Sequence, residues 1–235
     1  MYLFAIEGVA NTASFRIPES HTFQQTLPLP PITTLAGLVG AALGLSFEAA
    51  MRFRDENSLC LGVIGRYKGQ VKDLWKYRKI KMDEVISDVL LREYLVDFKM
   101  KLAIGSKNAK IVNQVRDAFL NPHYALTLGN SDDLLKICKV GQIEALKSSL
   151  SLEFQNTILP GDKTTLYEPM LDLKNTPITE PIRAPQVFLL PTAFSFKGNE
   201  RRVSRRKPFT FVGSPIQLKE PIPAFQIQEE KIVVL

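Results

Sequence analysis

The segment that decides the fold is Pro30–Gly44, which reads PPITTLAGLVGAALG. After the two prolines, Thr33 or Thr34 is predicted to cap a helix that continues to about Leu45. Small residues recur at helical spacing at Gly37, Gly40, Ala41 and Gly44. Each glycine costs about 1 kcal/mol in helix propensity, and close packing of the helix against a sheet is expected to offset this cost. An alternative is that the helix N-terminus holds a phosphate. The apolar run ends at Phe47, short of the roughly 20 residues of a membrane span.

Alternating and helical patterns around this helix predict the order β, α, β, β, α, β. The strands are expected at Tyr2–Ala10, Leu59–Tyr67, Arg92–Ile104 and His123–Leu128, and the second helix runs from its N-cap Asn108 to Leu120. This order is typical of an α+β, ferredoxin-like (RRM-like) βαββαβ domain, which we place at residues 1–150. Asn11–Pro31 is predicted to be a long loop and Lys68–Lys81 an extended or hairpin excursion. Residues 151–235, rich in proline, predict a small β-rich C-terminal region.

The net charge of +6 is concentrated in two segments. Residues 51–110 carry +6 and residues 181–235 carry +5, whereas the other two segments are acidic. Aromatic residues are interleaved with both basic clusters, as expected where cations meet phosphates and rings stack on bases. The pattern predicts binding to RNA or single-stranded DNA, and the alternative is a solvated charged hairpin or loop. The candidate RNA-binding residues are Arg16, His21, Arg66, Lys68, Lys72, Trp75, Lys76, Arg78, Lys79, Arg201, Arg202, Arg205 and Arg206.

The inventory of reactive side chains argues against catalysis and cofactors. Cys60 and Cys138 are far apart and predict two buried thiols rather than a zinc site. No phosphate-binding loop or hydrolase motif occurs, and Asp132–Asp133 predicts a capped or solvated turn rather than a metal site. We therefore expect no catalytic residue, metal or cofactor. A metal-independent ribonuclease that uses His21 or His123 with a nearby Tyr or Lys is the alternative.

Three stretches together resemble the family-five CRISPR-associated (Cas) proteins. Pro30–Gly44 resembles that family's proline- and glycine-rich helix, and Ser14–Pro18 resembles the loop that precedes it. Asn121–Asp133, NPHYALTLGNSDD, resembles the family's strand and turn. The matches come in the family's order within the first 135 residues, so the combination is specific.

The resemblance implies a RAMP-type subunit of a type I surveillance complex (Cascade) that serves antiviral defence. Such a subunit holds the 5′ handle of the crRNA and caps the backbone filament. The expected partners are the crRNA, the backbone and large subunits and, through the complex, target DNA. Whether a small subunit is also a partner is left open. A thumb hairpin is inserted at about residues 68–92, and Arg16 and His21 fall in the loop near the handle.

In most subtypes another subunit cuts the precursor, so this chain is interpreted as non-catalytic. The alternatives are an endoribonuclease that processes precursor crRNA and a general single-strand binder without a complex. The N-terminus has no basic region of the kind that precedes a signal peptide, which predicts a cytoplasmic protein with no membrane partner.

Reversing the charges of Arg201, Arg202, Arg205 and Arg206 is predicted to weaken RNA binding and to flatten its salt dependence. Titration of labelled RNA at several salt concentrations measures both quantities. If affinity and salt slope stay unchanged, these arginines do not contact RNA.

Overall fold

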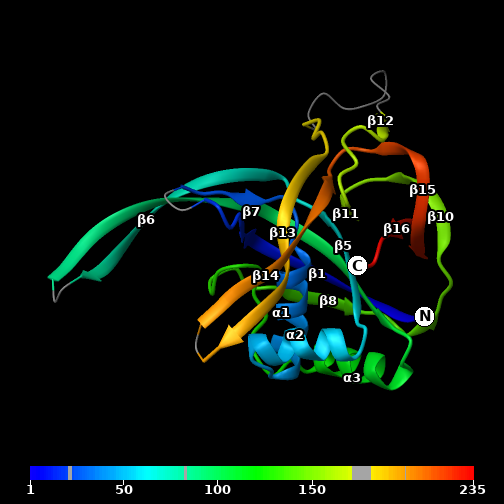
Figure 1. Cartoon of the computed structure of the whole chain (residues 1–235), viewed down its shortest axis with the longest axis horizontal. Coiled ribbons are helices and arrows are strands. Elements are labelled where there is room, and N and C mark those ends of the chain that lie inside the picture. Colours follow the sequence, from blue (N-terminus) through cyan, green and yellow to red (C-terminus); the bar gives the residue numbers. More distant parts are fainter. Residues whose placement is uncertain (21–22, 82–83, 171–180, 199) are drawn as a thin grey trace.

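The computed structural model describes residues 1–20, 23–81, 84–170, 181–198 and 200–235. Within these residues the chain forms three α-helices and sixteen strands. The class is mixed α and β, with a large, mainly antiparallel sheet. The helices gather along one side of this sheet, and one long hairpin projects away from the rest of the molecule (Figure 1).

Four strands form the centre of the large sheet in the order β5–β7–β1–β8. They are β1 (Tyr2–Ala13), β5 (Cys60–Arg66), β7 (Glu84–Ser106) and β8 (Lys136–Val140), and each pair is antiparallel. Helices α1 (Ile32–Leu43) and α2 (Phe47–Glu56) connect β1 to β5, and α3 (Ala109–Leu120) connects β7 to β8. Hydrophobic side chains on the helix-facing side of the sheet therefore form the main core with α1 and α3.

Strand alternation divides β1 between two cores. Phe4 belongs to the main core under the helices, whereas its neighbour Leu3 packs with Ile64, Ala103 and Ile232 on the other face. That other face is covered by a second sheet made of β10 (Ser149–Phe154), β12 (Tyr167–Pro169), β15 (Ile216–Ile227) and β16 (Glu230–Ile232). Both faces of β5 and of much of β1 are therefore buried, which explains their apolar runs, whereas β8 stays largely exposed.

The predicted α1 helix is confirmed, but its packing differs from the expectation. It begins at Ile32 with Pro31 as the N-cap, which provides no side-chain bond, and it ends at Gly44 in the left-handed region (φ 74°). A Cβ at Gly40 would overlap Ala50 of α2, whereas one at Gly37 would meet nothing within 4 Å. Gly40 therefore admits α2 rather than the sheet, because buried side chains of α1 such as Leu35 and Val39 are the ones that pack in the main core.

One helix and one strand of the central fold were not predicted, and one predicted strand is wrong. Helix α2, capped by Ser46, and strand β8 were both missed. The segment His123–Leu128 is not a strand, and only an isolated bridge joins Thr127 to Leu134. Its backbone N–H groups at His123 and Tyr124 donate instead to the carbonyls of Ala42 and Ala41 at the end of α1. A helix end leaves such carbonyls without partners, so this segment caps α1 instead of pairing with the sheet.

The predicted long loop Asn11–Pro31 includes the end of β1 and three two-residue strands. They are β2 (Phe15–Arg16), β3 (Phe23–Gln24) and β4 (Thr26–Leu27). β3 pairs in parallel with β7, and the Thr26 N–H donates to the buried carboxylate of Glu93, also on β7 (3.2 Å). The loop is thus bound along β7.

The predicted excursion is a hairpin of β6 (Gly69–Lys81) with the first half of β7. β5 and β6 pair with β7 in one continuous register, from Cys60↔Gly105 to Lys81↔Glu84. The hairpin is therefore an extension of the central sheet, and Figure 1 shows it curving away from the body.

The C-terminal region is β-rich, and part of it joins the large sheet. β11 (Thr157–Pro160) pairs with β5 and with β14 (Glu200–Val212), which pairs with β13 (Gln186–Lys197). A further short strand, β9 (Glu144–Ala145), pairs with β1. Hydrogen bonding of the large sheet thus joins strands on both sides of residue 150, the predicted boundary.

Two substitutions in α1 test the packing of its glycines. Gly40→Ala should lower the free energy of unfolding by about 1–3 kcal/mol, because the new methyl group overlaps Ala50. Gly37→Ala should raise it by up to about 1 kcal/mol, because the Cβ enters open space and alanine favours the helix. Urea unfolding measures both. Equal effects of the two substitutions would contradict the packing described here.

Candidate nucleic-acid interface

One face of the β6–β7 hairpin carries three cations, one of which, Lys72, lies 5.1 Å from the centre of the Phe23 ring. Lys72, Lys76 and Arg78 occupy positions of β6 that differ by four and by two residues, so they lie on the same face of the strand, together with exposed aliphatic side chains. None of the three makes an ion pair with any residue that the structure describes. The aliphatic side chains Leu74, Ile80, Val85 and Val89 are 51–77% exposed. We call this surface the cationic face.

The opposite face of the hairpin is an aromatic ladder. Tyr77 stacks on Trp75 (centroids 5.3 Å apart), and the Arg92 guanidinium lies 4.4 Å from the Trp75 ring and 5.2 Å from the Tyr94 ring. The Tyr77 hydroxyl donates to Asp88 (2.9 Å), and this hydrogen bond raises the pKa of Tyr77. Such cross-strand contacts stabilise a hairpin that has few neighbours.

The predicted mixture of cations and rings is therefore divided between two surfaces. Trp75 lies on the ladder, across the hairpin from Lys72 and Lys76, because successive residues of a strand point to opposite faces. Arg92 and Tyr94, which complete the ladder, were not among the predicted site residues. The side chain of Lys79 lies outside the described residues.

At the root of the hairpin the predicted cations have acidic partners. Arg66 lies 3.6 Å from Glu230, and Lys68 lies 2.7 Å from Asp97, its cross-strand neighbour. The hydrogen bond from Lys68 lowers the pKa of Asp97. These two cations are less available for phosphates than the three on the cationic face.

A second group of predicted residues surrounds a cleft beside α1, with a volume of about 600 Å³. One wall is the exposed side of α1, and the other is the β13–β14 hairpin. Arg16 and Arg201, far apart in sequence, both line it. We call this cleft the α1 slot. His21, predicted to lie in the same loop as Arg16, falls outside the described residues.

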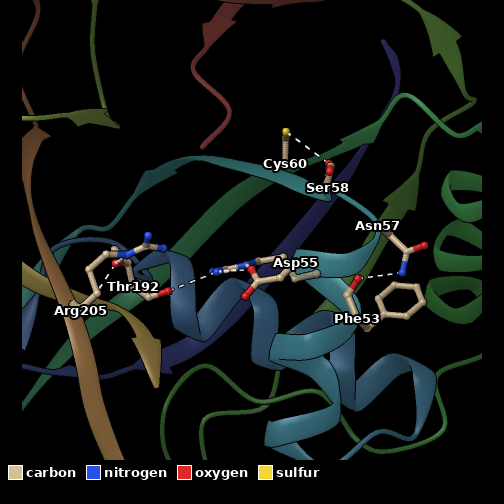
Figure 2. A network of polar contacts seen from close by, with 8 residues as sticks. Phe53, Asp55, Asn57, Ser58, Cys60, Thr192 and Arg205 are labelled. Atoms are coloured by element: carbon tan, nitrogen blue, oxygen red, sulfur yellow. Dashed lines mark hydrogen bonds and ion pairs between the residues drawn. The ribbon is translucent and has the colours of Figure 1, made fainter. Parts of the chain in front are cut away.

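The other arginines of β14 have distinct contacts. Arg202 pairs with Glu200 (2.9 Å), and Arg206 pairs with Glu19 of the β2–β3 loop (2.7 Å). Arg205 donates a hydrogen bond to the Thr192 hydroxyl (3.2 Å). The Thr192 carbonyl accepts a hydrogen bond from Arg54 of α2 (3.2 Å), and Figure 2 shows this network around Thr192. Part of this basic run therefore fixes the β13–β14 hairpin to its surroundings.

The remaining reactive residues have mainly structural surroundings. The His123 ring packs against Gly44 and lies edge-on to Tyr124, with centroids 4.5 Å apart. Both cysteines are free, but Cys138 is exposed, so the prediction of two buried thiols is wrong for it. Burial raises the pKa of the Cys60 thiol. Among the described residues no group of three His, Cys, Asp or Glu side chains could hold a metal ion.

The Asp132–Asp133 turn is not simply solvated. Asp133 is 1% exposed and accepts hydrogen bonds from the Thr12 hydroxyl (2.5 Å) and from Asn130 (2.9 Å), whereas Asp132 is exposed. Gly129 (φ 117°) lies where a Cβ would overlap the carbonyl of Ser14. This turn thus fastens the chain to the end of β1.

Sequence comparison assigns the chain to a family. Residues 5–202 match the family described as CRISPR-associated protein (Cas_Cas5), so the chain belongs to the Cas5 family of CRISPR-associated proteins. This confirms the resemblance stated from the three sequence stretches. No curated protein sequence matches the chain.

Solved structures share the fold at low sequence identity. A chain from a "CRISPR RNA-guided surveillance complex" superposes with a TM-score of 0.56 at 15% identity, over 94% of this chain and 91% of that one. A CRISPR protein from Archaeoglobus fulgidus gives 0.51 at 11% identity, over 100% and 99%. A chain of the Type III-B Cmr-beta complex bound to cognate target RNA and AMPPnP gives 0.51 at 11%, over 93% and 86%.

Within the part of the chain that the structure describes, no single helix is long and apolar enough to cross a membrane. Helices α1 and α2, which are bent by 103° at their junction, are together long and apolar enough for a broken membrane span, by length and composition alone.

Removing the central ring of the ladder should loosen the hairpin. Trp75→Ala deletes the contacts to Tyr77 and Arg92, each worth about 0.5–1.5 kcal/mol, so amides of Gly69–Arg78 should exchange hydrogen about tenfold faster. The matched control is Leu74→Ala, which truncates a side chain that is 68% exposed on the opposite face. Equal exchange in the two variants would exclude a stabilising role for the ladder.

Proposed function

We propose that this Cas5-family chain is a non-catalytic subunit of a type I CRISPR surveillance complex. It binds the 5′ handle of the crRNA and caps the backbone filament. Membership of the family supports a role in CRISPR defence, and a chain of similar fold occurs in an RNA-guided surveillance complex. Its partners would be the crRNA, the backbone and large subunits and, through the complex, target DNA. The complex would act in the cytoplasm.

The cationic face is the observation that carries the RNA-binding proposal. Lys72, Lys76 and Arg78 project from a hairpin that extends beyond the body, and they have no acidic partner among the described residues. Cations held in a row on an extended strand can follow the phosphates of a single strand. The neighbouring aliphatic side chains, such as Leu74, suit contact with an adjacent protein subunit.

We also propose that the helices and strands of the predicted domain, residues 1–150, have the ferredoxin-like topology. The strand order β5–β7–β1–β8 supports this topology, since β1 and β7 lie at the centre and helices connect β1 to β5 and β7 to β8. The thumb is then the β6–β7 hairpin, which continues two of the domain's strands.

The absence of catalysis is part of the proposal. His123 is held by packing on Gly44 and Tyr124, an arrangement that supports a structural role. The competing function is endoribonuclease processing of precursor crRNA. It is kept because His123, Tyr124 and Lys139 line one cavity of about 970 Å³ beside β8.

Charge reversal on the cationic face tests RNA binding. The triple variant Lys72→Glu, Lys76→Glu and Arg78→Glu should weaken binding to the guide RNA about tenfold or more. Its salt slope should fall by about 2, because each phosphate contact on a single strand contributes about 0.7. Filter binding between 50 and 300 mM salt measures both quantities.

The control reverses the same number of charges elsewhere, at the exposed residues Lys110, Lys147 and Lys219. It should retain most of the affinity and the salt slope. If both triple variants lose affinity equally, general charge rather than the cationic face binds the RNA.

Incubation with precursor repeat RNA in EDTA tests the absence of catalysis. We expect no cleavage by the wild-type chain. Cleavage at a fixed site that disappears in His123→Ala or His21→Ala would replace the proposal by the endoribonuclease function.

A further inference from the structure

The outer edge of β8 has no partner strand. β8 lies at one end of the large sheet and, among the described residues, pairs only with β1. The N–H of Leu135, just before β8, donates to the carbonyl of Leu126, on the side away from β1 (2.8 Å). Main-chain groups of alternate residues in a strand point to the same edge, so the N–H and C=O of Ile137 also face away from β1.

A bulge in the β1–β8 ladder adds Val140 to this edge. The register between the two strands shifts once along β8, and the Gly141 N–H donates to the carbonyl of Ala5 on β1 (2.8 Å). The main-chain groups of Val140, one residue earlier, therefore face outward. The N–H and C=O groups of Ile137 and Val140 thus form a row that another strand could bond.

A groove runs beside this edge, because the neighbouring segment turns away from it. Leu126 is bonded to Leu135, but the residues before Leu126 leave β8 and cap the carbonyls at the end of α1. The space between them has a volume of about 970 Å³ and is bordered by the C-terminal end of α3. Three apolar side chains that line it are 55–60% exposed: Leu120, Tyr124 and Leu134. We call this space the β8 groove.

The two faces of β8 differ in chemistry. The side chains of Ile137 and Val140 are partly buried and pack against the main core. Those of Lys136 and Lys139 are exposed, line the groove and make no ion pair with any residue that the structure describes. A strand laid beside β8 would therefore meet an apolar surface on one face and positive charge on the other.

The lysines decide between the possible occupants of the edge. They oppose pairing with a second copy of the chain, because two β8 edges would bring like charges together. Two carboxylates are near without forming an ion pair with either lysine: Glu7, opposite Lys139 on β1, and Asp132 in the groove lining. Both lysines are therefore available to acidic groups of an occupant. A single RNA strand would use the lysines but would leave the main-chain groups and the apolar lining without partners.

We propose that the outer edge of β8 receives an extended segment of another protein, in which acidic and apolar residues alternate. The segment adds a strand to the large sheet, a mode in which main-chain hydrogen bonds give affinity and alternate side chains give specificity. Its apolar side chains enter the β8 groove beside Tyr124, and its carboxylates lie next to Lys136 and Lys139. This inference goes beyond the proposed function, because the edge contains no residue of the cationic face.

A synthetic peptide tests strand addition on the full-length chain. The probe is a fluorescently labelled octapeptide in which glutamate and valine alternate, and fluorescence anisotropy measures its binding. It should bind the wild-type chain, protect the amides of Ile137 and Val140 from hydrogen exchange, and bind less tightly as salt is raised. A peptide with lysine in place of glutamate should bind about tenfold more weakly or worse.

Two further peptides separate strand addition from simple attraction of charges. An N-methylated peptide keeps every side chain and charge but has no main-chain donors, so it should lose about tenfold in affinity or more. A peptide with four glutamates followed by four valines keeps the composition but not the alternation. It should also bind more weakly, because its side chains cannot reach both faces of β8 in order.

Charge reversal on β8 tests the lysines. Lys136→Glu with Lys139→Glu changes two exposed side chains, so the variant should fold normally and bind the probe about tenfold more weakly. The matched control, Lys110→Glu with Lys219→Glu, reverses two exposed lysines elsewhere and should retain the affinity.

Four outcomes would overturn the proposal. They are no binding of the probe, equal affinity of the N-methylated and unmodified peptides, equal losses in the two charge-reversal variants, and protection of Ile137 and Val140 by a uridylate oligomer instead of the peptide. The last would assign the edge to RNA. The proposed function is judged separately by the RNA affinity of the cationic-face triple variant, in which β8 is unchanged.

Discussion

The structure depends on one strand, β7, which spans Glu84–Ser106. Its C-terminal half lies between β1 and β5 and has both faces buried, whereas its N-terminal half is one arm of the projecting hairpin. Because the register on β5 and β6 is continuous, the orientation of the hairpin is fixed by the packing of the core. A shift of one residue would exchange the cationic face with the aromatic ladder and would also expose Phe98 and Leu102.

The same constraint explains how the basic residues are used. Alternation leaves Lys72, Lys76 and Arg78 on one face, while Arg92 is held between two rings on the other. Cations near the body take structural roles, as Lys68 does with Asp97. The cations on the outward part of the hairpin thus have no acidic partner among the described residues, whereas Arg66 and Lys68 at its root do.

The sequence stretches that identify the family are explained by contacts within the fold. Gly40 admits α2 against α1, and the segment after α3 caps the carbonyls of Ala41 and Ala42. Asp133 is buried against Thr12 and fastens the following turn to β1. Each of these residues joins elements that are distant in sequence. The segment around Pro30–Gly44 also supplies the wall of the α1 slot, so one helix serves both the core and the candidate site.

The sequence by itself determined the elements whose signals are local. They include α1, the helix capped by Asn108, the long strands, the excursion at Lys68–Lys81 and the clustering of basic residues. Only the tertiary structure decided that His123–Leu128 caps a helix instead of forming a strand, because its N–H groups find partners at the end of α1. It also brought Arg16 to Arg201 and separated Trp75 from its neighbouring lysines. These arrangements depend on hydrogen bonding between segments that are distant in sequence and on the alternation of side chains along a paired strand. A count of charges along the chain includes neither of these.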